Sequence, residues 1–153
     1  QKIFDNEKID SCIHFAGLKA VGESVAKPWE YYNNNIAGTL TLVDVMRQNG
    51  CKNIIFSSSA TVYGDPAQIP ITEECPKGQC TNPYGWTKSM LEQMLIDIQK
   101  ADNEWNVIIQ TLPPSFIIDT ASSIILVITP SSLLTSILIA WKVLLAGCPP
   151  VLP

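Results

Sequence analysis

Residues 52–64 read KNIIFSSSATVYG, a short apolar run that leads into a cluster of small hydroxyl residues. Apolar runs of this length are typical of buried strands in parallel sheets. In open α/β sheets, ligands bind at the carboxyl ends of such strands. The stretch therefore predicts a strand that delivers Ser57, Ser58 and Ser59 to the edge of a binding cleft.

A long helix should follow this strand after a proline-rich excursion over residues 65–81. Asn82 and Pro83 have the residue types of a helix N-cap and first helical position. Beyond them the apolar side chains recur at helical spacing, at Leu91, Met94, Leu95 and Ile98. We expect a helix from about Pro83 to about Ala101.

Tyr84 and Lys88 are four residues apart, so they should lie on one face of that helix. An ammonium beside a phenol favours the phenolate, and it should lower the pKa of Tyr84 towards working pH. Tyr84 would then act as a general base, with Ser59 sharing the proton or holding the substrate hydroxyl. The alternative is that Tyr84 packs its ring, Lys88 is solvated and Ser59 forms a turn. The strand and the cap together favour catalysis, whereas Ser58 is expected to be structural.

Four segments carry a resemblance to known enzymes: HFAGLKAVGES at 14–24, YYNNN at 31–35, SSSATVYG at 57–64 and CTNPYG at 80–85. The Ser…Tyr-x-x-x-Lys pattern resembles the short-chain dehydrogenase/reductase superfamily. The four segments in order resemble the UDP-glucose 4-epimerase family, also called UDP-galactose 4-epimerases, over about residues 1–109. A lone Tyr-x-x-x-Lys is weak evidence, but four matching segments are specific.

This resemblance implies an α/β fold, a partial doubly wound Rossmann-type parallel sheet with flanking helices. It implies NAD as cofactor and no metal. The residues expected to contact NAD are Phe15, Ala16, Gly17, Lys19, Asn34, Ser57, Tyr84 and Lys88, and those expected to bind substrate are Ser59 and Tyr84. The Gly-rich pyrophosphate turn that opens such folds is absent from the sequence. We therefore interpret the chain as an internal fragment that lacks the first βα units.

The implied function is NAD-dependent epimerisation at C4 of a UDP-hexose, UDP-glucose or UDP-galactose, through a 4-keto intermediate, in galactose metabolism. One alternative is an inactive epimerase remnant or a non-catalytic scaffold. A second is a sugar-nucleotide 4,6-dehydratase, but that family has Asp-Glu where this chain has Ala60 and Thr61. By resemblance, the full-length enzyme should form a homodimer through the helix at 28–49 and the helix at 83–101.

The long helix at 28–49 should bury a stripe formed by Trp29, Tyr32, Ile36, Leu40 and Val43 and should end at Gly50. On strand 9–16, His14 is expected to be buried and not to act as a base. The net charge of −4 and the lack of a basic run argue against a nucleic-acid partner. Five cysteines without metal-ligand spacing are expected to be reduced thiols of a cytoplasmic protein.

The pattern changes near residue 110. Residues 110–153 are apolar and rich in Ser, Thr and Pro, with only Asp119 and Lys142 charged. We expect a partial NAD-binding domain at 1–109 and a divergent tail at 110–153 that is not native to the fold. A membrane helix at 124–147 is the alternative, but Pro130 and Lys142 interrupt it, so we favour out-of-frame or unspliced coding sequence and expect no membrane span.

Overall fold

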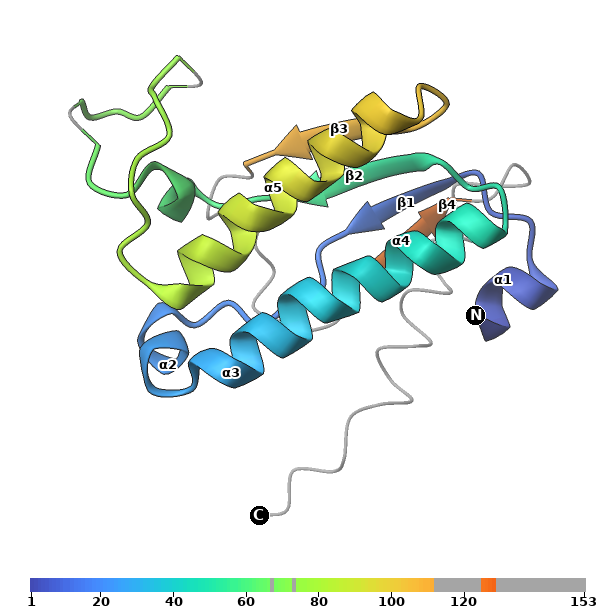
Figure 1. Cartoon of the computed structure of the whole chain (residues 1–153), viewed down its shortest axis with the longest axis horizontal. Helices are drawn as coiled ribbons and strands as arrows, with labels where there is room; N and C mark the ends of the chain where they lie inside the picture. The colour runs from blue at the N-terminus through green and yellow to red at the C-terminus, as the bar shows by residue number, and fades with distance from the viewer. Residues whose placement is uncertain (67, 73, 112–124, 129–153) are drawn as a thin grey trace.

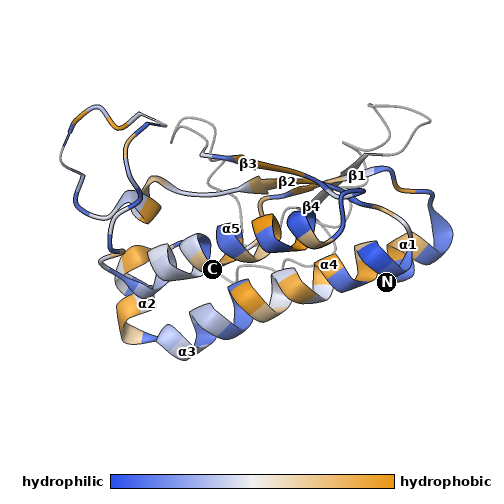
Figure 2. Cartoon of the chain, turned by 45° about the horizontal axis from the view of Figure 1, so that its top comes forward, coloured by the Kyte–Doolittle hydropathy of each residue, from blue (hydrophilic) through white to orange (hydrophobic). Residues whose placement is uncertain are grey.

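A computed structural model describes residues 1–66, 68–72 and 74–111, and the backbone of residues 125–128. Its described strands form one sheet in the order β3-β2-β1-β4. The strands are β1 (Ser11–His14), β2 (Asn53–Ser57), β3 (Asn106–Gln110) and β4 (Ile125–Ile128). The first three are mutually parallel, and the helices lie along one face of the sheet, as Figures 1 and 2 show. The predicted α/β fold class is confirmed for this part of the chain.

The register of the parallel strands brings their carboxyl ends to one edge. His14 pairs with Phe56, and Ser57 pairs with Gln110. The chain leaves β1 at His14 and β2 at Ser57, so the segments that follow these neighbouring strands emerge side by side. That edge is where the sequence predicts the binding site.

Alternation along the strands divides the sheet into a helix-facing side and an opposite side. Cys12, His14, Ile54 and Phe56 are buried towards the helices, where the core cluster lies. On β3 the intervening Ile108 is 48% exposed. In the described part of the chain, the core therefore lies between the sheet and the helices. Figure 2 shows apolar residues, in orange, on the strands and on the helices.

The segment between β1 and β2 begins with α2 (Val21–Ala26) and continues as one unbroken helical run. This run is α3 (Pro28–Tyr31), a π-helical segment (Tyr32–Ala37) and α4 (Gly38–Gln48). Gly50 follows at φ +70°, in the left-handed region that favours glycine, which confirms the predicted end of the helix.

The predicted apolar stripe of this run is wrong in its phase. Trp29 is 74% exposed and Leu40 is 42% exposed, although Val43 is buried as expected. The buried face is formed instead by Tyr31, Asn35, Thr39, Val43 and Met46. Two causes explain the difference: the wider π-helical turns shift the register, and the buried polar side chains are hydrogen-bonded, which offsets the cost of their burial.

The helix α5 (Pro83–Ala101) has the bounds that the sequence predicts. The Asn82 side-chain oxygen accepts a hydrogen bond from the Gly85 amide at 2.8 Å, and Pro83 occupies the first turn. Leu91 and Leu95 are fully buried against the sheet. Cap and stripe together fix the helix that carries Tyr84 and Lys88.

Two shorter helices complete the described fold. The N-terminal helix α1 spans Lys2–Asn6. A 3₁₀ turn at Ala60–Tyr63 follows β2, and the Ser59 side chain caps it. None of the described helices combines the length and apolarity needed to cross a membrane.

The strand β4 lies within the segment predicted to be a divergent tail. It pairs antiparallel with β1, with Cys12 opposite Val127. Of the predicted tail, residues 110, 111 and 125–128 are described, and the membrane alternative at 124–147 lies outside the described residues except for this strand. The division into a domain at 1–109 and a tail therefore stays a prediction.

Candidate active site

Three consecutive serines lie at the end of β2, beside the helix α5. Ser57 closes the strand, Ser58 continues its pairing through a 2.9 Å bond from its amide to the Gln110 carbonyl, and Ser59 begins the 3₁₀ turn. Parallel pairing with β3 therefore holds this segment on one side. The helix α5 contacts it from the other.

Lys88 is directed at the strand end. Its side chain is nearly buried, and its Nζ donates a 2.7 Å hydrogen bond to the Ser57 carbonyl. The same ammonium lies 4.7 Å from the centroid of the Phe56 ring and 6.0 Å from that of Tyr84. Burial lowers the pKa of Lys88 to about 8, although the Glu92 carboxylate opposes the shift. Lys88 therefore remains mostly charged at neutral pH.

Tyr84 lies one turn before Lys88 on the same face of α5, as the spacing predicts. The predicted lowering of its pKa is wrong for this chain: burial raises the pKa of Tyr84, while a hydrogen bond with the Ser59 side chain lowers it. The reason is that a phenolate loses solvation in the buried site, while the neighbouring ammonium is bonded to a carbonyl. Ser59 is thus the group that favours the phenolate here.

The Ser59 hydroxyl also binds the turn that follows it. It accepts hydrogen bonds from the Thr61 amide at 3.3 Å and the Thr61 hydroxyl at 3.0 Å. The structure therefore brings Ser59, Tyr84 and Lys88 together, and with them a hydroxyl, a phenol and an ammonium. Such a set can move a proton to and from a substrate alcohol.

The loop after β1 carries the next group of predicted contacts. Phe15 is 40% exposed, Ala16 and Gly17 are half-buried and Lys19 is exposed. Gly17 has φ +149°, and a Cβ there would lie 3.1 Å from the Asn35 side-chain oxygen. The loop therefore needs glycine at this point to pack against the π-helical segment.

Asn35, which the sequence did not single out, anchors this loop. Its side chain accepts from the Leu18 amide at 2.8 Å and donates to the Leu18 carbonyl at 2.9 Å. It also donates to the Thr87 hydroxyl at 3.1 Å, and Thr87 in turn bonds the Tyr84 carbonyl at 2.7 Å. The neighbouring Asn34, predicted to contact the cofactor, is exposed and donates to Asn35 at 3.1 Å. One amide thus connects the loop to the helix of Tyr84.

His14 is buried at the end of β1, as expected. Its Nε2 lies 2.7 Å from the Thr39 hydroxyl, a partner that the sequence analysis did not identify, and its Nδ1 is buried without a partner in the described part of the chain. Burial lowers the pKa of His14 to about 4, and the positive charge of Lys88 adds to the shift. A neutral imidazole with these contacts supports the β1 end and is poorly suited to be a base.

Glu92 is a further residue that the sequence analysis missed. It is 2% exposed, one turn beyond Lys88 on α5, and accepts hydrogen bonds from the Ser58 hydroxyl and the Lys77 ammonium. The signal was a carboxylate between Leu91 and Leu95, at the i+4 position from Lys88. It shows that the predicted structural role of Ser58 includes a contact with α5.

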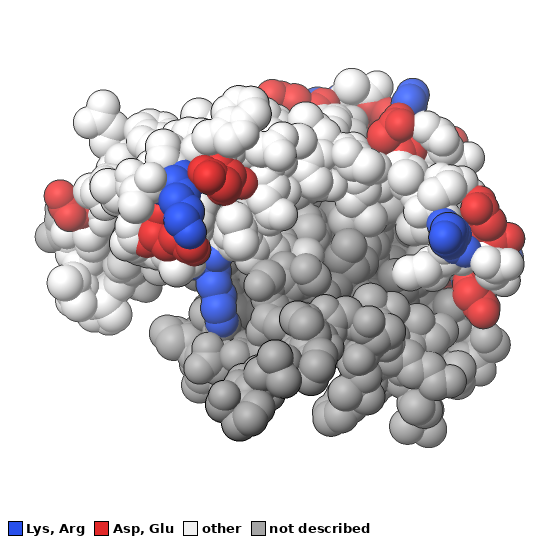
Figure 3. Space-filling model, turned by 90° about the horizontal axis from the view of Figure 1, so that it is seen from below, with Lys and Arg blue, Asp and Glu red and all other residues white. Residues whose placement is uncertain are grey.

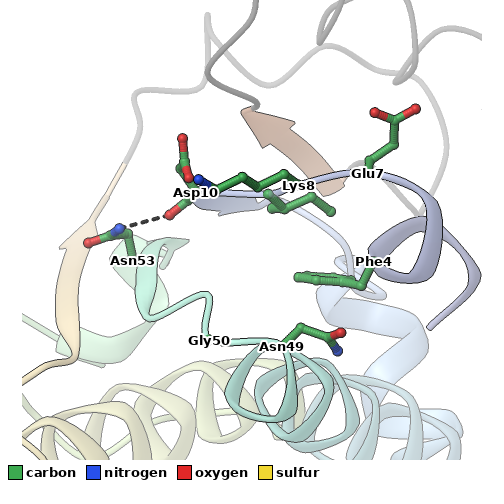
Figure 4. A pocket seen from close by; sticks show the side chains of 8 residues that line it. Phe4, Glu7, Lys8, Asp10, Asn49, Gly50 and Asn53 are labelled. Atoms are coloured by element: carbon green, nitrogen blue, oxygen red, sulfur yellow. Dashed lines mark hydrogen bonds between the residues drawn. The ribbon is translucent and has the colours of Figure 1, made fainter.

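The described part of the chain also has a pocket of about 360 Å³ away from these residues. It lies at the amino ends of β1 and β2, where Asn53 bonds the Asp10 carbonyl at 2.7 Å (Figure 4). Its lining residues are Phe4, Glu7, Lys8, Ile9, Asp10, Asn49, Gly50 and Asn53, and none of them is a predicted site residue. The candidate site is thus at the opposite edge of the sheet.

Charged side chains on the face in Figure 3 lie in groups of mixed sign, blue beside red.

The four cysteines among the described residues, at 12, 51, 75 and 80, are free thiols. In the same part of the chain, no cluster of three or more His, Cys, Asp or Glu side chains could hold a metal ion.

Comparison with known proteins places these features in a family. A model of the NAD dependent epimerase/dehydratase family matches residues 1–114. UDP-glucose 4-epimerase 2 of Arabidopsis thaliana is 60% identical over 109 residues, covering 71% of this chain and 31% of that protein. The UDP-glucose 4-epimerase of Haemophilus influenzae is 61% identical over 109 residues, covering 71% of this chain and 32% of that protein.

Solved structures agree with this likeness. UDP-glucose 4-epimerase from Bifidobacterium longum, crystallised with NAD+ and UDP, matches with a TM-score of 0.70 and 56% identity, over 72% of this chain and 33% of that one. The Brucella ovis UDP-glucose 4-epimerase in complex with NAD matches with a TM-score of 0.59 and 42% identity. The match covers 63% of this chain and 29% of that chain. The chain spans about a third of the length of the curated relatives it matches.

Proposed function

This chain belongs to the NAD dependent epimerase/dehydratase family, and from that premise we propose that it is the catalytic segment of a UDP-glucose 4-epimerase. The substrate would be a UDP-hexose, UDP-glucose or UDP-galactose, whose C4 is inverted through a 4-keto intermediate. The observation that carries the proposal is the convergence of Ser59, Tyr84 and Lys88 at the carboxyl edge of a parallel sheet. Identities of about 60% to UDP-glucose 4-epimerases support it.

The residues at this edge fit a nicotinamide cofactor. Phe15 offers an exposed aromatic ring, Asn34 an exposed amide and Lys88 an ammonium, which match the ring, carboxamide and hydroxyl groups of such a ligand. The proposed contacts are Phe15, Ala16, Gly17, Lys19, Asn34, Ser57, Tyr84 and Lys88. When bound, NAD supplies the acceptor for the hydride that leaves C4 and the donor that returns it.

The chain's own residues would handle the proton. Tyr84 takes it from the sugar 4-hydroxyl, Ser59 holds that hydroxyl within reach, and both return to their starting states when the proton is given back. Lys88 supplies a positive charge one turn away on the same helix face. Because Ser59 is near enough to lower the pKa of the Tyr84 phenol, the proton acceptor and the hydroxyl that positions the substrate are neighbours.

Two other functions remain as alternatives. The chain covers about a third of its relatives, so the 153 residues as given could be an inactive remnant or a scaffold. A 4,6-dehydratase would need a carboxyl pair after Ser59, whereas Ala60 has none and Thr61 bonds Ser59. The epimerase proposal fits these residues best.

The test is a Tyr84→Phe substitution in a full-length protein that carries this segment. Loss of the proton acceptor should lower kcat by about 10²–10⁴-fold with UDP-galactose, because general base catalysis contributes this much. NAD+ binding, followed by protein fluorescence, should be retained. Wild-type turnover in Tyr84→Phe would refute the assignment of the base.

The 153-residue chain needs a separate measurement. Titration with NAD+ followed by addition of UDP-galactose should give saturable binding and NADH-like absorbance if the chain is competent by itself. Absence of both, together with an active full-length protein, would favour the remnant.

A further inference from the structure

The three serines at the end of β2 each meet a different residue of α5. The Ser57 carbonyl accepts from Lys88, the Ser58 hydroxyl donates to Glu92, and the Ser59 side chain is near enough to Tyr84 to lower the pKa of its phenol. On the helix these partners occupy positions 84, 88 and 92, one turn apart on one face. These three contacts therefore align the strand end with the helix, and the epimerase chemistry proposed above uses only Tyr84 and Lys88 among the three partners.

Glu92 binds a second segment as well. Its other carboxylate oxygen pairs with Lys77, from the excursion at 65–81 that precedes α5. The Glu92 side chain is 3% exposed, whereas that of Lys77 is 51% exposed. A buried carboxylate is costly unless its oxygens are bonded, and here each oxygen has a partner.

The charge of Glu92 also acts on Lys88. The titratable groups that face Lys88 are Tyr84 and Glu92 on its own helix and His14 from β1, and the Phe56 ring packs beside it from β2. Among these, Glu92 raises the pKa of Lys88 against the effect of burial. An apolar residue at position 92 would leave the ammonium without this support.

We propose that Glu92 is a positioning residue of this site: its carboxylate fastens the strand end and the 65–81 excursion to α5 and holds the charge of Lys88 at the strand end. It acts through Ser58, Lys77 and Lys88 and not on the substrate. The relevance of this role to catalysis rests on the proposed epimerase function. The contacts of Glu92 with Ser58 and Lys77 do not depend on that function.

The first experiment measures the pKa of Lys88 in the 153-residue chain by competitive acetylation and mass spectrometry. Wild-type Lys88 should titrate near 8. Glu92→Gln keeps an acceptor for Ser58 but removes the charge, so the pKa should fall by about half a unit to one unit. The exposed Glu104→Gln, a matched change beside Lys52, should leave it unchanged.

A second variant reverses the sign of the effect. Lys77→Met removes a half-exposed positive charge from beside Glu92 and should raise the pKa of Lys88 by a few tenths of a unit. Because Lys77 lies near the surface, this variant should fold. Equal Lys88 pKa values in wild type, Glu92→Gln and Lys77→Met would overturn the proposal, as would wild-type Lys88 titrating like an exposed lysine.

Kinetics of the full-length protein then separate this proposal from the function. Glu92→Gln should lower kcat with UDP-galactose about three- to tenfold and change KM less than twofold, with an altered pH profile. An active wild type with an unaffected Glu92→Gln would refute the positioning role and leave the function intact. Shifted Lys88 pKa values without epimerase activity in the wild type would refute the function and leave the positioning contacts intact.

Discussion

His14, the one histidine of the sequence, shows how a single buried residue can make the fold sensitive to acid. It is 4% exposed, with Thr39 against one ring nitrogen and Lys88 close enough to disfavour its protonation. Its pKa lies near 4 in the folded chain and has an ordinary value of 6.5. The folded state therefore keeps the imidazole neutral in a range where the unfolded chain binds a proton.

The consequence is a loss of stability at acid pH. The contribution of His14 should be fully present above pH 6.5 and should be lost as the pH falls from 6.5 to about 4. His14→Gln should remove this dependence, a difference of about 2–3 kcal/mol across the window. Urea unfolding of both chains at several pH values measures it, and parallel curves for the two would contradict the assignment.

At the scale of the element, α5 depends on its cap. Asn82 is 7% exposed, and its 2.8 Å bond to the Gly85 amide fixes the first turn, which contains Tyr84. Asn82→Ala should lower the free energy of unfolding by about 1 kcal/mol, because the first turn loses an acceptor. Asn82→Asp retains an acceptor and a favourable charge at the helix start, so it should remain close to wild type. Equal losses in the two variants, measured by urea unfolding, would show that the cap bond is not the cause.

The bounds of α5 were predictable because they follow from local signals, a capping asparagine, a proline and an apolar stripe. The phase of the long helix at 28–49 was not, since its π-helical turns and its buried Asn35 and Thr39 depend on partners at Leu18 and His14. Sequence patterns that count apolar residues do not reveal polar side chains that are buried because they are hydrogen-bonded.

In the candidate site, too, some features follow from local sequence signals and others depend on tertiary packing. The Tyr84 and Lys88 pairing follows from their spacing, but the direction of the Tyr84 pKa shift depends on how deeply α5 is buried. The Ser58–Glu92 contact joins residues 34 apart in sequence, so no local sequence pattern predicts it. The residue types of a site can be read from the sequence, whereas its electrostatics require the packing.

At the scale of the whole molecule, the helices expose large apolar side chains. Trp29 on α3, Leu40 on α4 and Met90 on α5 are 74%, 42% and 39% exposed. A contiguous exposed apolar patch is typical of a surface that binds another protein. We propose that the full-length protein is a homodimer that uses these helices.

This proposal predicts an outcome for one pair of variants of the full-length protein. Leu40→Glu should shift it from dimer to monomer in analytical ultracentrifugation, because it would bury a charge in the interface. Ile69→Glu is the matched control: Ile69 is 85% exposed in the 65–81 excursion, and its change should leave the dimer intact. A monomeric wild type, or a dimer that survives Leu40→Glu, would refute the use of this surface.

The one-to-one matching of Ser57, Ser58 and Ser59 with Lys88, Glu92 and Tyr84 has a consequence for how this segment can vary. Gaining or losing one residue there would move the Ser57 carbonyl and the Ser58 and Ser59 hydroxyls out of register with their partners on α5. Single replacements would damage one bond at a time. Indels between Phe56 and Thr61 should therefore be far less tolerated than substitutions, and the length of this strand end is under tighter constraint than its composition.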